Sequence, residues 1–216
     1  AEHIARAKRS QLSFGRRFFD GAFENALENL SLESSGASLA RVRVLLSEAG
    51  AVEASFRELK ASSWGKDSLR VLLASERVDS SNAFLRHKTT VRQLYDETFK
   101  EVHALGFDEA LFLNERDEIS EGAISNIVVD FADGSSATPA LSSGVLPGLW
   151  RAGELRAGGV QERTIALAEM LEKAVAIRMG NSVRGGCELA ELWKRDSASE
   201  SGFSLIWRRQ RSAQCP

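Results

Sequence analysis

Lys88 is the residue whose position most suggests covalent amine chemistry. It lies in FLRHKTTVR, between a predicted strand and a predicted helix, where packing into a domain junction would remove its amine from water. Desolvation lowers the pKa of a lysine and leaves a free amine that can form a Schiff base with a carbonyl compound. A lone lysine is far more often a solvated surface residue, so this assignment needs support from other residues.

Two further segments could hold parts of a small charged ligand. Glu121, in ISEGAISN, could keep a heteroaromatic nitrogen protonated, although a glutamate beside a glycine is also common in turns. The segment at 142–151, SSGVLPGLWR, leads into a helix whose first amides and dipole favour an anion. Pro147 has no N–H, so the donors would be the amides of Leu149 and Trp150. Many Pro-Gly turns bind nothing, so this signal is weak on its own.

Two arginines could bind carboxylate or phosphate groups. Arg184 lies in GNSVRGG (180–186), where small polar residues follow an apolar run, although an ordinary glycine-rich turn has the same composition. Arg43, in RVRVLL, lies within a strand-like apolar run, where an unpaired charge would be costly. It should therefore meet an anion, which is either a carboxylate of the protein or one of a substrate.

The first of two expected domains spans residues 1–79 and is small and of α+β type. Its expected elements are helices at 1–15 and 20–31, a hairpin around Gly50, and a buried strand at 68–78. The polar, turn-like segment DSSN at 79–82 is the expected domain boundary. The chain begins at Ala1 and passes directly into a helical pattern, so we expect that an earlier segment, including the first strand of this domain, is missing.

The second expected domain spans residues 86–216 and is larger. A helix from about Thr90 to Leu105 is followed by strands and shorter helices, and an irregular tail begins near residue 187. Strands and helices alternate without the rhythm of a doubly wound sheet. The pattern therefore indicates an α+β or α/β fold.

The composition argues against several classes of protein. The net charge is −2, with no dominant basic field, so neither nucleic acid nor a membrane surface is an expected partner. No apolar run approaches the length of a membrane span, and no signal peptide is evident. The two cysteines and three histidines lack metal-ligand spacing, so no metal is expected. The few cysteines agree with a cytoplasmic location.

Taken in order, five motifs resemble those of the fold-type IV, or class IV, pyridoxal-phosphate aminotransferase family. They are EHIARAKRS (2–10), HKTTVRQLYDE (87–97), SEGAISNIVV (120–129), TPALSSGVLPGLWR (138–151) and GNSVRG (180–185). Each motif is weak alone, but five in the right order are specific. The resemblance covers the chain from His3 to about Gly186, and it implies a two-domain fold whose larger domain contains a barrel-like sheet.

The resemblance also implies a pyridoxal 5′-phosphate cofactor and assigns residues to it. Lys88 would form the Schiff base, and Glu121 would contact the pyridine nitrogen. The phosphate contacts would come from the Arg6 side chain, from the Leu149 and Trp150 amides, and from Asn181 and Ser182. Transaminases of the family usually carry threonine at the position of Trp150, so a hydroxyl contact would be lost here while the amide remains.

Within the family, the HKTTVR and NSVRG segments look most like aminodeoxychorismate lyase, and particularly like the lyase domains joined to aminodeoxychorismate synthase. This resemblance implies conversion of 4-amino-4-deoxychorismate to 4-aminobenzoate and pyruvate in the folate pathway. Arg43 and Arg184 would then bind the substrate's two carboxylates. A homodimer is implied, either linked to the synthase or working with it. The alternatives are a branched-chain or D-amino acid aminotransferase and a catalytically degenerate family member.

Overall fold

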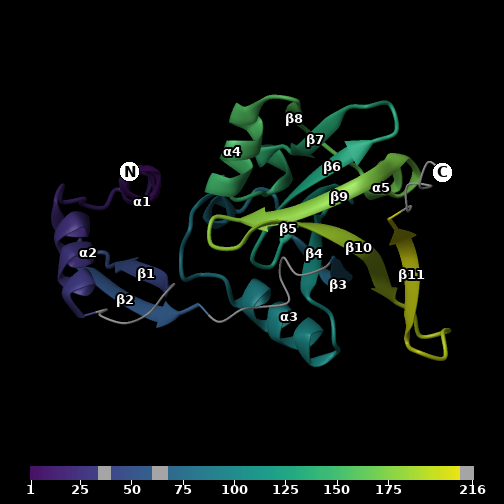
Figure 1. Cartoon of the computed structure of the whole chain (residues 1–216), viewed down its shortest axis with the longest axis horizontal. Helices are drawn as coiled ribbons and strands as arrows, with labels where there is room; N and C mark the ends of the chain where they lie inside the picture. Colours follow the sequence, from purple (N-terminus) through teal and green to yellow (C-terminus); the bar gives the residue numbers. More distant parts are fainter. Residues whose placement is uncertain (34–39, 60–67, 210–216) are drawn as a thin grey trace, which may run out of the picture. The chain divides into compact units, whose positions relative to one another are not determined.

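The computed structural model describes residues 1–33, 40–59 and 68–209. The chain divides into two compact units, residues 1–61 and 62–216 (Figure 1). Within the described residues, no helix is both long enough and apolar enough to cross a membrane. The same residues contain no group of histidine, cysteine and acidic side chains that could hold a metal ion.

The smaller unit consists of two helices and an antiparallel hairpin. These elements are α1 (Glu2–Ser13), α2 (Ala22–Glu33), β1 (Ala40–Leu46) and β2 (Val52–Glu58). The hairpin turns at Gly50, whose φ of 87° lies in the left-handed region that favours glycine. A Cβ at Gly50 would also lie only 2.6 Å from the ring of Phe19. The hairpin predicted around Gly50 is confirmed.

The larger unit is built on a nine-stranded mixed sheet that curls into a half-barrel, with the strand order β5-β4-β3-β10-β9-β6-β7-β8 and β11 paired to β10. Its strands are β3 (Leu69–Val78), β4 (Glu109–Asn114), β5 (Ile119–Gly122), β6 (Asn126–Phe131), β7 (Ser136–Pro139), β8 (Val160–Arg163), β9 (Ala174–Asn181), β10 (Gly185–Arg195) and β11 (Phe203–Arg208). Its helices are η1 (Ala83–Arg86), α3 (Gln93–Ala104), η2 (Leu141–Ser143), α4 (Leu149–Ala157) and α5 (Leu167–Lys173).

Two apolar cores hold the larger unit together. In one core, α3 packs against β3 and β4, with Val102 of the helix in the same cluster as Leu72 and Phe112. The other core lies around β6, β9 and β10, where α5 contributes Met170. Every residue of β4 is buried, and its central residues, 110–113, form a continuous apolar run rather than an alternating one.

The units divide after residue 61, whereas the sequence pattern placed the boundary at 79–82. The reason lies in β3, which pairs in parallel with both β4 and β10 and so belongs to the sheet of the larger unit. Parallel partners far along the chain leave no local sequence signal. The segment at 79–82 is a turn that follows β3, not a linker between units.

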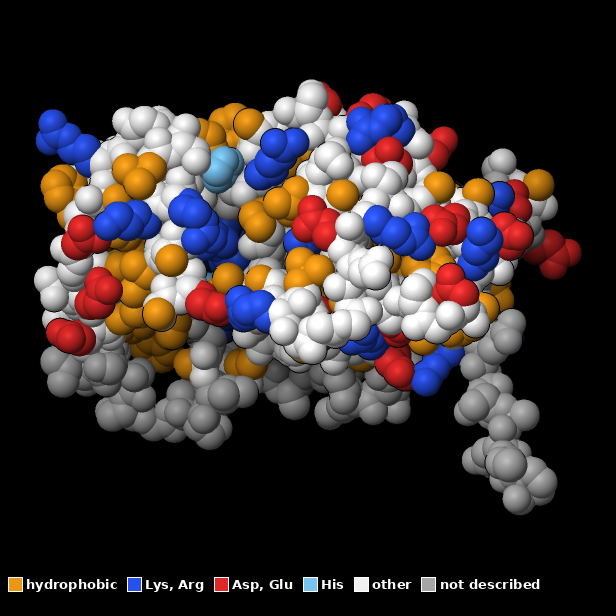
Figure 2. All heavy atoms as spheres, turned by 90° about the horizontal axis from the view of Figure 1, so that it is seen from above, with side chains coloured by type: hydrophobic (Ala, Val, Ile, Leu, Met, Phe, Trp, Pro, Cys, Tyr) orange, Lys and Arg blue, Asp and Glu red, His pale blue; other side chains and the backbone are white. Residues whose placement is uncertain are grey.

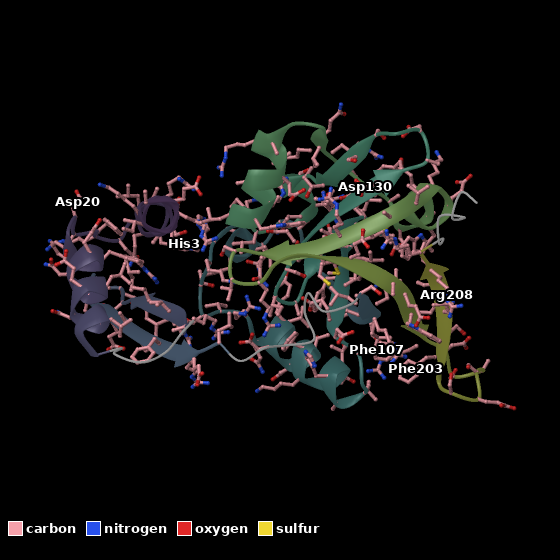
Figure 3. The ribbon with its side chains drawn as sticks, in the orientation of Figure 1. His3, Asp20, Phe107, Asp130, Phe203 and Arg208 are labelled. Atoms are coloured by element: carbon pink, nitrogen blue, oxygen red, sulfur yellow. The ribbon has the colours of Figure 1, made fainter. Side chains whose placement is uncertain are left out.

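The expectation of an irregular tail from about residue 187 is wrong for residues 187–208. These residues form most of β10, which lies between β3 and β9 near the middle of the sheet, and all of β11. The rings of Phe203 on β11 and Phe107, which follows α3, lie close together in Figure 3, with centroids 5.3 Å apart. This contact joins the last strand to the core under α3.

Acidic and basic side chains occur together on the surface that the structure describes. Figure 2 shows basic and acidic side chains interspersed on the face drawn, without a large field of either sign. Several are paired, such as Arg178, which bonds both Glu154 at 2.6 Å and Asp130 at 3.3 Å. Paired surface charges of this kind mainly keep the surface hydrated and contribute little to stability.

Candidate active site

A pocket of the larger unit has both Lys88 and Glu121 in its walls. The rest of its lining comes mainly from the segment between η1 and α3 and from the first turn of α3. Within that segment, the Thr89 hydroxyl accepts a hydrogen bond from the Val91 amide at 3.2 Å, which fixes the backbone just after the lysine. Lys88 and Glu121 are far apart in the sequence. They line the same pocket because β5, which carries Glu121, ends beside the start of α3.

The Lys88 side chain is exposed in this structure. The desolvation that we expected for its amine is therefore not provided by the residues that the structure describes. The positive charge of Lys88 does, however, lower the pKa of Glu121, so the two groups interact electrostatically. Lys88 thus lies in the pocket with its amine accessible to a ligand.

Glu121 lies on β5 and is only 8% exposed. Its Oε2 accepts hydrogen bonds from Asn126 Nδ2 at 3.0 Å and from the Leu146 amide at 3.1 Å. Burial raises the pKa of the Glu121 carboxyl to about 8, although the Leu146 amide and the charges of Lys88 and Arg92 act in the opposite direction. A carboxyl with this pKa can share a proton with a ring nitrogen near neutral pH.

Tyr95 is a second buried polar group of the pocket. Its ring is 7% exposed, and its Oη forms no hydrogen bond within the described residues. Burial and the nearby Glu121 carboxylate raise the pKa of Tyr95, so the phenol stays protonated. The guanidinium of Arg92 lies 5.5 Å from the ring centroid and also bonds Asp96 at 2.8 Å. A buried hydroxyl without a partner is a group that a bound ligand would satisfy.

The start of α4 is tied to this pocket through Asn126. The helix begins at Leu149 with Gly148 as its N-cap, and no side chain caps it, so the first amides, including that of Trp150, lack helical acceptors. Asn126 Nδ2 donates to the Leu146 carbonyl at 3.0 Å, and a Cβ at Gly148 would collide with Asn126 Oδ1. The free amides of α4 are therefore held at a fixed distance from the β5 carboxylate.

The indole of Trp150 packs directly against β9 and β10. A Cβ at Gly180 would overlap the indole ring, and a Cβ at Gly186 would lie 3.2 Å from it. These two glycines are cross-strand partners, so together they leave the space that the ring occupies. The Trp150 side chain therefore anchors α4 to the sheet.

The turn between β9 and β10 uses Asn181 mainly to fix its own shape. Asn181 Oδ1 accepts from the amides of Val183 and Arg184, both at 3.0 Å, and its Nδ2 donates to the Ile124 carbonyl at 3.2 Å. Ser182 is exposed, and its hydroxyl has no hydrogen bond within the described residues. Of the two residues predicted to contact phosphate here, Ser182 is the one whose side chain is available.

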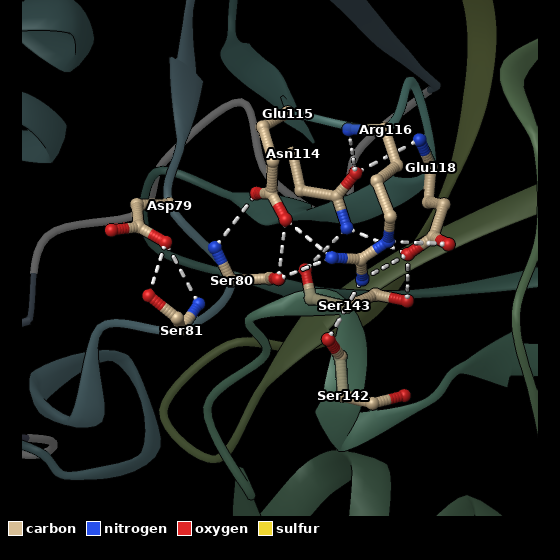
Figure 4. Close-up of polar contacts among 9 residues, drawn as sticks. All are labelled: Asp79, Ser80, Ser81, Asn114, Glu115, Arg116, Glu118, Ser142 and Ser143. Carbon is tan, nitrogen blue, oxygen red and sulfur yellow. Dashed lines mark hydrogen bonds and ion pairs between the residues drawn. The ribbon is translucent and has the colours of Figure 1, made fainter.

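A cluster of polar side chains around Arg116 connects two segments that lead into the site, one at Ser80 and one at Ser142 (Figure 4). Arg116, in the turn between β4 and β5, donates to Ser80 Oγ at 2.7 Å, on the stretch that runs toward the lysine. It also donates to the Ser142 carbonyl at 3.1 Å, on the stretch before α4, and pairs with Glu118 at 2.7 Å. One guanidinium thus links the lysine segment to the segment that carries the free amides.

Arg6 and Arg43 belong to the smaller unit, whereas the other predicted site residues belong to the larger one. Arg6 lies on α1 and is half-buried, with its Nη2 3.4 Å from His3 Nδ1. Arg43 is exposed on β1, in a hollow that it shares with Arg41 and Arg57. Arg43 has no ion pair within the part of the chain that the structure describes, so of the two anions expected for it, a protein carboxylate is not found there and a substrate carboxylate remains a proposal.

The sequence reasoning missed three residues of this site, Tyr95, Arg92 and Asn126. It also missed Glu109, a buried residue of β4 whose carboxyl accepts from the turn after Glu121. Signals for three of these four were present. Tyr95 is the one tyrosine of the chain and lies shortly after Lys88, in the same HKTTVRQLYDE motif. Asn126 belongs to the same motif as Glu121. Glu109 is a charged residue at the edge of a run that becomes fully buried, which is unusual unless the charge is satisfied. Arg92 could not be separated from an ordinary surface arginine.

The half-barrel sheet and the small N-terminal sheet define the fold as that of the fold-type IV aminotransferases. The site fits this class, because it combines an accessible lysine, a buried glutamate and a free helix N-terminus. The model of the class IV aminotransferase family matches residues 1–192, and the chain belongs to this family. Members of the family typically depend on pyridoxal phosphate.

Solved structures of the same fold cover most of the chain. A protein of Mesorhizobium loti, provisionally named an amino-acid aminotransferase, is 35% identical over 88% of this chain and 89% of its own, with a TM-score of 0.79. A provisionally named 4-amino-4-deoxychorismate lyase of Legionella pneumophila is 21% identical, covering 88% and 76%, with a TM-score of 0.73. A provisionally named branched-chain aminotransferase of Thermotoga maritima is 22% identical, covering 88% and 70%, with a TM-score of 0.76. No curated protein matches the chain.

These identities bear on the expected subtype. At 21% and 22%, the likeness to the lyase and to the branched-chain enzyme shows the fold alone. The likeness at 35% extends over nearly the whole of both chains, and it is to a protein with an aminotransferase name. The comparisons therefore establish the class IV family and not the subtype within it.

Proposed function

We propose that this chain is a pyridoxal-phosphate-dependent aminotransferase that acts on amino acids and 2-oxo acids. The observation that carries the proposal is the pocket that contains both an accessible lysine and a buried glutamate, in a chain 35% identical to a provisionally named amino-acid aminotransferase. In the net reaction, an amino acid becomes a 2-oxo acid, and its amino group passes to a second 2-oxo acid.

The residues of the larger unit fit this cofactor. Lys88 would hold its aldehyde carbon, Glu121 its pyridine nitrogen, and Tyr95 Oη, which has no partner in the described residues, could donate to one of its oxygens. The Leu149 and Trp150 amides at the start of α4 would hold the phosphate, and the exposed Ser182 hydroxyl is a further proposed contact. The family resemblance adds Arg6 and Asn181 as phosphate contacts. When bound, pyridoxal phosphate withdraws electrons from the substrate carbon beside the reacting nitrogen.

The side chains of this chain supply the proton movements. The Lys88 amine, once free, removes the proton from the α-carbon of the amino acid as a general base and returns it in the reverse half-reaction. Glu121 holds a proton shared with the ring nitrogen, because its raised pKa of about 8 makes it a strong acceptor. Asn126 and the Leu146 amide fix the carboxylate that does this.

Arg184 and Arg43 are the proposed carboxylate-binding residues for the substrate. Arg184 lies in the β9–β10 turn, where the Asn181 side chain fixes its backbone amide at 3.0 Å. Arg43 shares its hollow with two more arginines, and Arg41 stands directly opposite Arg57 in the hairpin register. Like charges in opposed positions destabilise a hairpin, which favours an anion at this face. We expect Arg184→Met and Arg43→Met to raise KM for the substrate more than they lower kcat.

A lyase acting on 4-amino-4-deoxychorismate is the second candidate function. The observation in its favour is local: HKTTVR around Lys88 and NSVRG at 181–185 resemble the lyases more than the branched-chain enzymes. A lyase would use the same lysine and glutamate but would release pyruvate and an aromatic amine. Product analysis separates the two, because an aminotransferase converts amino-acid and 2-oxo-acid pairs and forms no 4-aminobenzoate.

The cofactor assignment is tested with Lys88→Ala against Lys100→Ala, an exposed lysine on α3. The wild type and Lys100→Ala should bind pyridoxal phosphate with an absorbance band in the near-visible range that borohydride abolishes. After borohydride reduction, Lys88→Ala should carry no covalently attached cofactor, because it lacks the amine that forms the Schiff base. A wild-type protein that binds no pyridoxal phosphate would refute the proposal, and one that binds it but turns over neither substrate class would be a degenerate member.

A further inference from the structure

Glu109 is a fully buried carboxylate whose hydrogen bonds converge on the site. It begins β4 and has no exposed surface. Its Oε1 accepts from the amides of Ala110 at 2.9 Å and Ala123 at 3.1 Å. Its Oε2 accepts from the Ile124 amide at 3.2 Å and from Ser125 Oγ at 2.8 Å. Three of these four donors belong to one short turn, residues 122–125, between β5 and β6.

This turn connects three segments of the proposed site. Glu121 directly precedes it, on β5. The Ala123 carbonyl accepts from Arg92 Nη2 at 2.5 Å, at the start of α3 and four residues after Lys88. The Ile124 carbonyl accepts from Asn181 Nδ2 at 3.2 Å, in the turn between β9 and β10. A shift of the turn would therefore move the glutamate, the lysine segment and the proposed phosphate-binding turn relative to one another.

The turn is packed directly against the Glu109 carboxyl group. A Cβ at Gly122 would lie 3.1 Å from Glu109 Cδ and 2.7 Å from Met179 Cε, and it would overlap Ser125 Oγ. The space beside Gly122 is therefore filled by the Glu109, Ser125 and Met179 side chains. Burying a carboxylate costs free energy unless all its acceptor positions are used, and here each oxygen has two donors. The geometry of the carboxylate thus fixes the geometry of the turn.

We propose that Glu109 is a positioning residue that sets the turn at 122–125 and, through it, the placement of Glu121 and the two carbonyls that receive Arg92 and Asn181. Glu109 lines no part of the pocket and acts only through these residues. The effect on cofactor binding rests on the proposed function, whereas the hold on the turn does not.

The test compares Glu109→Gln, Glu109→Asp and Ser125→Ala with Thr138→Val in the full chain. Glutamine keeps the shape, but its NH₂ faces amide donors and cannot accept from them, so up to two of the four bonds are lost. Ser125→Ala removes one bond to Glu109 and is the milder variant, which keeps the test decisive if Glu109→Gln does not fold. Thr138 is the control, since its hydroxyl is also fully buried and bonds the Ile127 carbonyl at 2.8 Å, outside the turn.

Two readouts are needed. The first is hydrogen exchange of the amides at 123 and 124 without cofactor, which should become about tenfold faster in Glu109→Gln and unchanged in Thr138→Val. The second is the affinity for pyridoxal phosphate and the pH titration of its bound absorbance band. We expect about tenfold weaker binding and a shifted titration midpoint in Glu109→Gln, with smaller changes in Ser125→Ala and partial recovery in Glu109→Asp.

The outcomes separate the two hypotheses. If Glu109→Gln and Ser125→Ala lose stability as Thr138→Val does but keep normal cofactor affinity and an unshifted titration, Glu109 is only structural and the inference is overturned. If amide exchange in the turn is unchanged, the inference is overturned whatever the cofactor does. If the wild type binds no pyridoxal phosphate, the proposed function fails, and the exchange rates still decide whether Glu109 fixes the turn.

Discussion

Two buried carboxyl groups of the larger unit differ in how their oxygens are used. Both oxygens of Glu109 accept two hydrogen bonds each, all from residues 110–125. Glu121 accepts two bonds at Oε2, from Asn126 Nδ2 and the Leu146 amide, and its carboxyl forms part of the pocket wall. Glu109 lines no part of that pocket, and its four donors tie it to the protein alone. This difference separates a residue that shapes the site from one that borders the space for a ligand.

The pH dependence of stability follows from the raised pKa of Glu121. Burial raises the pKa from 4.5 to about 8 in the folded protein, so the folded state binds the proton more tightly than the unfolded state does. The free energy of unfolding should therefore fall as pH rises from about 4.5 to about 8. Glu109, whose pKa burial raises to about 7, acts in the same direction.

Glu121→Gln should flatten that dependence, because glutamine does not titrate. Urea unfolding of the cofactor-free protein at several pH values between about 5 and about 8 measures it. Glu118→Gln is a suitable comparison, since hydrogen bonds from Arg116 lower the pKa of Glu118 to about 2 and so shift its effect to more acidic pH. A Glu121→Gln slope equal to that of the wild type would contradict the assignment of this pKa.

At single positions, the sequence revealed the residues that belong to recognisable motifs and missed those that support them. Lys88 and Glu121 were predicted through motif order, and the structure places both in one pocket. Tyr95 and Glu109 were not predicted, because what matters is an unpartnered hydroxyl in one case and four converging donors in the other. Both properties depend on neighbours that are distant in sequence, so no local pattern encodes them.

Trp150 shows how one side chain can fix the direction of a helix. Its indole occupies the space left by Gly180 and Gly186, and its own amide is among the free donors at the start of α4. The ring and the amide belong to the same residue, so the sheet and the donors are held in a fixed relation.

A glycine pair tests this anchoring. Gly180→Ala should force the indole of Trp150 away from β9 and lower the free energy of unfolding by about 1–3 kcal/mol, as overpacking does. Gly153→Ala should raise it by up to about 1 kcal/mol, because Gly153 lies inside α4 with open space around it and alanine favours a helix. Urea unfolding of both variants measures this. Changes of the same sign in both would contradict the model of the anchored helix.

The Arg116 cluster predicts an effect on ligand affinity that exceeds its effect on stability. Arg116→Met removes the bonds to Ser80 and Ser142, which link the lysine segment to the segment before α4. Because the guanidinium is nearly half exposed, the loss of its ion pairs should make unfolding only slightly easier. The dissociation constant for pyridoxal phosphate should nevertheless rise about threefold to tenfold, because the segments lose their fixed spacing.

Arg77→Met is the matched control for that experiment. Arg77 pairs with Asp117, at the tip of the same β4–β5 turn, at 2.8 Å, but it contacts neither segment. It should lose a similar amount of stability and leave cofactor affinity unchanged. Equal effects of the two variants on affinity would show that the cluster does not act on the site.

Among the elements, local pattern predicted helices and hairpins well and failed for β10. The hairpin at Gly50 has a glycine at the turn and alternating residues on both sides, so its signal is local. In GGCELAELWKR, polar and apolar residues alternate as in a half-exposed strand, although the strand lies in the middle of the sheet. Its central place depends on pairing with β3, more than a hundred residues earlier, which a local pattern does not contain.

The two units differ greatly in the size of their apolar cores. In the described part of the smaller unit, Phe23 is the one apolar side chain that is buried, whereas two large clusters stabilise the larger unit. Burial of apolar surface is the main favourable contribution to folding, so the smaller unit should be the less stable part.

Hydrogen exchange of the whole chain measures this difference. Amides of β1 and β2 should exchange much faster than those of β4, β6 and β9 in the absence of denaturant, and they should lose protection at lower urea concentrations. Fluorescence and circular dichroism should then report transitions that do not coincide. Uniform protection across both sheets would contradict the ranking of the two units.

The central position of β10 has a consequence for synthesis on the ribosome. β3 and β9 are both made before β10, and each must wait with an unpaired edge until residues 185–195 have emerged. Their apolar edges are open to wrong partners during that interval, which is when chaperones and neighbouring nascent chains compete for them. The larger unit therefore cannot complete its sheet until nearly all of it has left the exit tunnel of the ribosome. The yield of active protein will depend on what protects β3 and β9 before that point.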